Sequence, residues 1–201
     1  MTENRRPLGS DLARIAVFAA LIIVLGMVTI PLPGGVPITG QTLGVMLAGL
    51  VLGARRAPLA VLLVLALAAV GLPVLAGGRG GLGVFVGPTA GYLLGWVAGT
   101  IVIGLIAYSG RFTWWRAAIA AVVGGIGVVY LFGIPVLAAV TGMPLGAAAL
   151  SNVVFLPGDL LKAAAAVVLV VALARAYPRA LADRASGRLA PIVTAEAARA
   201  S

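Results

Sequence analysis

The sequence predicts an all-α integral membrane protein with six transmembrane helices, both termini in the cytoplasm, and outer loops rich in Gly and Pro. Of its 201 residues, 62% are hydrophobic and only 9% are charged, whereas soluble domains are about 45–50% apolar. Apolar runs fill nearly the whole length. We therefore expect a single membrane domain over residues 1–201, with a helical bundle at about 12–176 and a basic cytoplasmic tail at 177–201.

Six apolar runs are the candidate spans: Leu12–Ile30, Thr42–Leu52, Pro58–Leu72, Pro88–Tyr108, Ala117–Val140 and Leu156–Ala174. The second run is shorter than the ~20 residues that cross a bilayer, so it could instead be re-entrant. If this run crosses the membrane, every arginine except Arg79 lies on the same side of it. If it does not cross, nine arginines lie on one side and four on the other. The positive-inside bias therefore favours six spans, with the arginine-rich side facing the cytoplasm. We expect the protein to lie in the plasma membrane.

Several function classes are excluded by composition. The formal net charge of +9 comes from arginines in short gaps and in the tail, which membrane orientation explains better than nucleic-acid binding. No Cys or His is present, so thiol chemistry and the usual zinc or iron sites are excluded. A P-loop is absent, and the glycines at 78–83 lack the strand and the acidic residue of a dinucleotide fold. We expect neither an enzyme nor a cofactor or metal site, and energised transport would need other proteins.

Two charges begin the last apolar run. Asp159 is the only acidic residue between Asp11 and Asp183, and Lys162 is the only lysine. Three positions apart on a helix, they share a face. The structural alternative is an acid at a helix start with a lysine as its partner. Because a charge within a membrane segment costs about 2.5–3.5 kcal/mol on insertion scales, we favour a ligand site facing the outer surface.

Other polar residues fall at the outer ends of the runs. Thr39 and Gln41, the only glutamine, could line the same cavity as Asp159, although capping is the common role of Thr. Arg79 is the single charge of a Gly-rich outer loop and could pair with a ligand carboxylate or stay solvated. Tyr92 and Trp96 lie one turn apart, where aromatic residues are usually part of an interfacial belt.

Small residues predict close packing. Glycines recur every four residues at Gly91, Gly95 and Gly99, a spacing that lets helix backbones approach in lipid. The Gly-rich stretch at 124–127, with Pro135, predicts a bend or break in the fifth span. Ala16 and Ala20 form a small-x-x-x-small pair in the first span, which could pack within the chain or receive another membrane subunit.

Five ordered stretches together resemble the BioY family, the biotin-specific substrate-binding (S) components of energy-coupling-factor (ECF) vitamin transporters. They are Val36–Thr42, Gly71–Pro73 with Ala76–Gly81, Gly87–Tyr92, Tyr130–Pro135 and Leu156–Lys162. The resemblance covers roughly residues 12–174. It implies six membrane helices, high-affinity capture of biotin at the outer side, and delivery inward with a transmembrane coupling (T) subunit and two ATPase subunits of the ABC type.

The resemblance also implies residue roles. A cyclic urea offers two N–H donors to Asp159 and a carbonyl to Lys162, while Gln41, Tyr92 and the Arg79 loop would complete the pocket. Ala16 and Ala20 resemble the motif with which S components contact the T subunit. The sequence departs from the family pattern at Ala90, Val136 and Leu93; the last stands where some members have an arginine. The alternatives are a carrier of another small vitamin or metabolite, and a structural subunit without a ligand.

Overall fold

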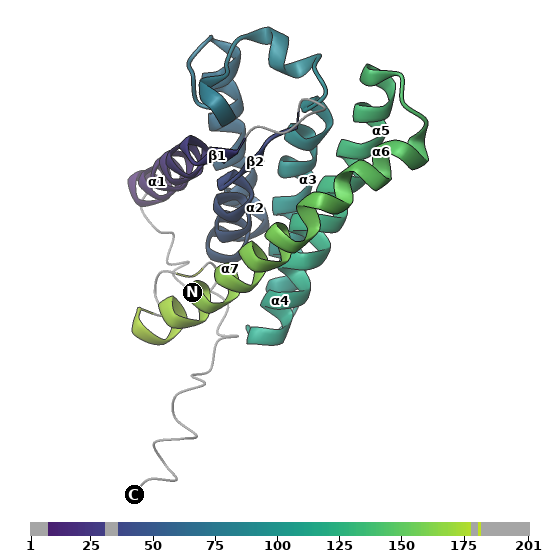
Figure 1. Cartoon of the computed structure of the whole chain (residues 1–201). Coiled ribbons are helices and arrows are strands. Elements are labelled where there is room, and N and C mark those ends of the chain that lie inside the picture. The colour runs from purple at the N-terminus through teal and green to yellow at the C-terminus, as the bar shows by residue number, and fades with distance from the viewer. Residues whose placement is uncertain (1–7, 31–35, 178–180, 182–201) are drawn as a thin grey trace, which may run out of the picture.

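The computed structural model describes residues 8–30, 36–177 and 181, and it is almost entirely helical (Figure 1). The predicted tail beyond Tyr177, apart from Leu181, lies outside the described residues, as does part of the first outer loop. The elements are α1 (Leu8–Met27), β1 (Thr29–Ile30), β2 (Ile38–Thr39), α2 (Gln41–Ala69), η1 (Ala76–Gly78), η2 (Leu82–Phe85), α3 (Ala90–Ala107), α4 (Trp114–Val122), η3 (Val123–Val128), α5 (Val129–Thr141), α6 (Leu145–Asn152), η4 (Val153–Phe155) and α7 (Leu156–Ala176). Within the described chain, five helical stretches are long and apolar enough to cross a membrane. The all-α membrane class is confirmed at this level.

Helix α2 is bent sharply at Gly53. This residue has φ 73° and ψ 179°, a backbone conformation that is open to glycine and closed to other residues. A straight helix of 29 residues would be about 43 Å long. However, the Gln41 side chain at its start bonds to the backbone of Val74, a few residues beyond its end. The two arms of α2 therefore fold back toward each other, and the ends of both arms away from the bend meet the loop that carries η1.

Glycines let α3 approach its neighbours closely. A β-carbon on Gly95 would lie 2.8 Å from Cα of Val129, and one on Gly91 would collide with the Phe132 carbonyl. Gly99 faces the carbonyl of Gly124 in η3 in the same way. The packing predicted from the four-residue spacing is confirmed, since the glycine face of α3 lies against η3 and α5.

The predicted irregularity in the fifth span is a π-helical turn. The chain runs from α4 through the π-helix η3 into α5, and η3 contains the Gly-rich stretch. Such turns insert one residue into a helix and shift the face that follows them. Val129 and Tyr130 come directly after the turn, and both line the pocket described below.

The segment from Thr141 to Phe155, which we expected to be a loop, is largely helical. Helix α6, η4 and α7 follow one another without a break and form an apolar stretch from Leu145 to Ala176. The Ala- and Leu-rich composition of α6 explains the difference, because these residues are strong helix formers. Between α1 and α2, β1 and β2 pair as two short antiparallel strands.

The bundle closes around α2 and α3, which both contribute to the two core clusters. Helix α1 packs on α2, and α7 contacts α2 and α4. In Figure 1, α7 crosses the other helices diagonally, while the loop with η1 and η2 covers one end of the bundle. A pocket lies beneath this loop.

Candidate functional site

Asp159 is the centre of a buried polar network. Its side chain lies on α7 and the residue is only 6% exposed. One carboxylate oxygen, Oδ1, accepts hydrogen bonds from Lys162 Nζ at 2.9 Å and from Thr42 Oγ1 at 3.4 Å. The other, Oδ2, accepts a hydrogen bond from the Tyr130 hydroxyl at 2.7 Å. Lys162 also donates to Thr42 Oγ1 at 3.1 Å, so α2, α5 and α7 meet at this point.

Asp159 lies in the first turn of α7 and pairs with Lys162, as the structural alternative expects, but its other contacts go beyond that alternative. Helix α7 has Phe155 at its N-cap, with helical backbone angles and no side-chain cap hydrogen bond. The preceding residues already form α6 and η4, so the chain enters α7 as a helix rather than starting one. Besides Lys162 of its own helix, the carboxylate accepts hydrogen bonds from Thr42 on α2 and Tyr130 on α5.

The network forms part of the wall of a pocket. The empty space between the walls is about 640 Å³, including the part open to the outside. Four polar residues with predicted roles, Thr39, Arg79, Tyr92 and Gln41, line it together with Asp159 and Lys162. The remaining lining residues are Val36, Pro37, Ile38, Thr42, Leu75, Ala76, Thr89, Leu93, Trp96, Val129, Tyr130 and Phe155.

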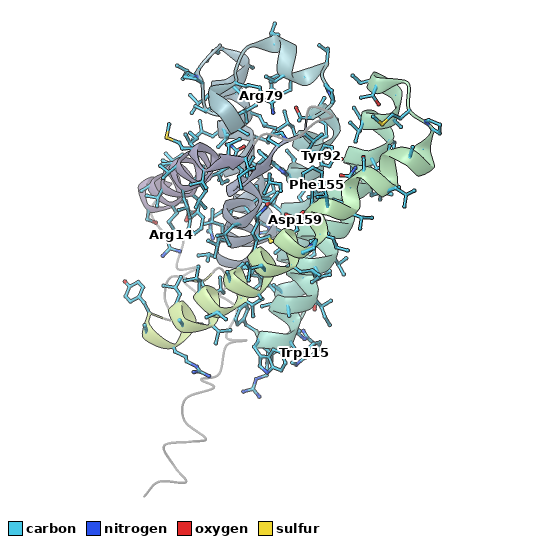
Figure 2. The ribbon with its side chains drawn as sticks, viewed as in Figure 1. Arg14, Arg79, Tyr92, Trp115, Phe155 and Asp159 are labelled. Carbon is cyan, nitrogen blue, oxygen red and sulfur yellow. The ribbon has the colours of Figure 1, made fainter. Side chains whose placement is uncertain are left out.

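Gln41 and Arg79 hold the loop above the pocket. The Gln41 carboxamide donates to the Val74 carbonyl at 3.1 Å and accepts from the Ala76 N–H at 3.1 Å. Arg79 Nε donates to the Ala76 carbonyl at 3.1 Å, and Thr39 Oγ1 accepts the Gln41 N–H at 3.2 Å. Figure 2 shows Arg79 in the loop and Asp159 further into the bundle. We call the end of the pocket beside this loop its mouth. The pocket therefore has a cation near its mouth and an ion pair further into the bundle.

Tyr92 and Trp96 are not belt residues, because their exposed fractions are 8% and 6%. The Tyr92 hydroxyl donates to Oδ1 of Asn152 on α6 at 2.5 Å, and the Asn152 amide donates to the Ala148 carbonyl. The Tyr92 and Tyr130 rings meet edge to face, with centroids 6.5 Å apart. Two tyrosines thus tie α3 and α5 to the α6–α7 stretch.

Sequence reasoning missed three residues of this arrangement. Tyr130 was part of a family-like stretch without a role of its own, and Trp96 was taken as interfacial. Asn152 was not considered, although it is the only asparagine after Asn4, which was the available signal. It is 1% exposed, at the end of a helix that is mostly apolar.

Ala16 and Ala20 lie away from the pocket, on α1. Both side chains are exposed, so they do not pack against the described bundle and the intramolecular alternative is not supported. Leu12, Val17 and Val24 on the same helix are also exposed. Near its start, α1 is joined to the bend of α2 by an ion pair between Asp11 and Arg56 at 2.9 Å.

The fold and the pocket define a helical membrane protein with a pocket whose wall presents both hydrogen-bond donors and acceptors. The sequence profile of the BioY family matches residues 2–179. The biotin transporter BioY of Rhizobium etli is 48% identical over 178 residues, covering 84% of this chain and 95% of that protein. The biotin transporter BioY of Rhodobacter capsulatus is 50% identical over 182 residues, covering 85% and 96%.

A solved structure agrees with these relatives. The crystal structure of the S-component for biotin from an ECF-type ABC transporter superposes with a TM-score of 0.80 at 34% identity, covering 90% of this chain and all of that one. The chain belongs to the BioY family.

Proposed function

We propose that this chain is the biotin-binding S component of an ECF-type uptake transporter in the plasma membrane. The observation that carries the proposal is the buried pair of Asp159 and Lys162, joined at 2.9 Å, on the wall of a pocket in a BioY-family chain. Such a pair is costly in a membrane protein and is typical of a ligand site. The function is capture and transport, with no chemical change to the ligand.

The urea ring of biotin matches the charges at the bottom of this pocket. Its N–H groups would donate to the Asp159 carboxylate, which retains acceptor capacity beside Tyr130 on Oδ2. Its carbonyl would accept from Lys162, whose ammonium has three N–H groups and uses two of them on Asp159 and Thr42. Asp159 and Lys162 would thus bind the donors and the acceptor of the same urea ring.

The carboxylate of biotin would lie near the mouth, where we assign it to Arg79. The guanidinium is half-buried and lines the pocket, and its Nε is fixed by the Ala76 carbonyl. This leaves its terminal amino groups for a carboxylate, a pairing that arginine geometry favours. Thr39 and Tyr92 would line the walls, and Gln41 would act by holding the loop in place. In this assignment Arg79 supplies the positive charge that some family members have as an arginine at the position of Leu93.

We also propose six membrane crossings with both termini in the cytoplasm. The bend at Gly53 supports this, because the two arms of α2 then cross separately. With this bend, Arg55 and Arg56 lie on the same side of the membrane as the turn before α4, and Arg79 lies on the opposite side. The chain has no Cys, so single-cysteine variants can test it with a membrane-impermeant maleimide. We expect Leu82→Cys to react in intact cells and Arg55→Cys to react only after permeabilisation; reaction of both in intact cells would rule out six spans.

The partners in this proposal are a T subunit and two ABC-type ATPase subunits. The exposed small residues Ala16 and Ala20 on α1 provide a surface on which a helix of the T subunit could approach closely. A different vitamin or metabolite is the competing ligand. Competition of unlabelled vitamins against radiolabelled biotin on the purified chain separates the two, since only biotin should displace the label at stoichiometric concentration.

A further inference from the structure

Trp96 carries a buried hydrogen-bond donor without a partner. It lies on α3, one turn after Tyr92, and is 6% exposed. Its indole Nε1 makes no hydrogen bond with any residue that the structure describes. The side chain also lines the same pocket as Asp159 and Lys162. Buried donors in native proteins are almost always paired, so this one requires an explanation.

The two tyrosine donors in the pocket wall are already engaged. The Tyr92 hydroxyl donates its only proton to Asn152, and the Tyr130 hydroxyl donates its proton to Asp159. The Gln41 amide uses one of its two N–H groups on the Val74 carbonyl. Toward the cavity the two tyrosines therefore offer only acceptor lone pairs, whereas the Trp96 indole offers a donor and has no acceptor function at all.

The position of Trp96 indicates which part of a ligand it would meet. Helix α3 starts beside the loop that carries Arg79, so each turn along it lies further from that loop. Trp96 follows Tyr92 by one turn and belongs to an apolar cluster with Leu93 and Val129. A neutral N–H in apolar surroundings suits a neutral acceptor such as a carbonyl or thioether, whereas a carboxylate is better served by Arg79 near the mouth.

We infer that Trp96 is a ligand-binding residue whose indole N–H donates a hydrogen bond to a neutral acceptor at the ring end of the bound molecule. This inference rests on the proposed function, in which that molecule is biotin and its urea faces Asp159 and Lys162. Trp96 adds a neutral N–H donor at the end of the pocket where Lys162 supplies a charged donor. The indole face would also cover the apolar part of the ring.

Titration of the purified protein with biotin tests the affinity. Trp96→Phe keeps an aromatic ring and removes the N–H, and we expect it to weaken biotin binding by about tenfold. The matched control is Trp115→Phe, because Trp115 lies half exposed on α4, away from the pocket (Figure 2). Biotin amide, which lacks the carboxylate, should show the same penalty; a penalty that disappears with the amide would contradict the ring-end assignment.

A spectroscopic measurement separates hydrogen bonding from packing. In protein labelled with ¹⁵N-tryptophan, the indole proton of Trp96 should move downfield when biotin binds, while those of Trp114 and Trp115 stay in place. Trp114→Phe and Trp115→Phe identify the signals without altering the pocket. An affinity loss without this shift, or no loss at all, overturns the inference and leaves the biotin function standing. A wild-type chain that does not bind biotin overturns both.

Discussion

Asp159→Asn is the sharpest perturbation of the proposed site, because it changes the charge with almost no change in shape. An asparagine oxygen could still accept from Lys162 and Thr42. The negative charge 2.9 Å from Lys162 Nζ would be gone, and an amide donor would stand where Oδ2 now accepts from Tyr130. A ligand N–H would therefore lose a charged acceptor and face a mismatched network.

The expected magnitude follows from these contacts. Hydrogen bonds to charged groups are worth about 1.5–3 kcal/mol, and removing one member of a buried ion pair costs about 3–5 kcal/mol. Part of the second cost falls on folding, so we expect a loss of roughly 3 kcal/mol in binding, on the order of a hundredfold in Kd. Tyr130→Phe leaves the ion pair intact and should cost less, about two- to tenfold.

Isothermal titration calorimetry with biotin measures the effect, and the melting temperature followed by tryptophan fluorescence reports on folding. Asp11→Asn is the matched control, since Asp11 also forms an ion pair at 2.9 Å, with Arg56, but neither residue lines the pocket. It should leave biotin affinity unchanged. If folded Asp159→Asn binds biotin within about threefold of wild type, the assignment of Asp159 to the ligand is wrong.

Three further substitutions test other parts of the site. Lys162→Met should also weaken biotin binding by roughly a hundredfold in calorimetry, and wild-type affinity would remove Lys162 from the site. A β-carbon at Gly133 would collide with the Tyr92 ring, so Gly133→Val should lower biotin affinity at least tenfold. Gly146→Val, in open space, is the control and should leave the affinity unchanged. Equal effects of the two substitutions would contradict the role of Tyr92 in the pocket. Ala20→Trp should abolish co-purification with the T subunit while biotin still binds, and retained co-purification would exclude this surface.

Much of the fold could be predicted from composition and spacing. The apolar runs identified the membrane class, and the glycines at 91, 95 and 99 predicted the close approach of α3 to its neighbours. An irregularity in the fifth span was predictable from its glycines, which fall within the π-helical turn η3. The proximity of Asp159 and Lys162 was predictable because residues three apart on a helix share a face.

The remaining features depend on contacts between distant segments. Tyr92 is buried because Asn152, 60 residues later, accepts its hydroxyl proton, and because Gly133 leaves room for its ring. No local pattern encodes such a pairing, so a buried aromatic residue looks the same in sequence as one in an interfacial belt. Helix α6 was missed for a local reason, since prolines and glycines on both sides of it suggested a loop.

Binding of biotin to the purified chain, without any partner subunit, tests the central proposal most directly. Calorimetric titration in detergent should give one biotin per chain, with an affinity that falls in Asp159→Asn and is unchanged in Asp11→Asn. A folded, monodisperse chain that binds no biotin, or binds it equally well in both variants, would contradict the proposed function of this pocket.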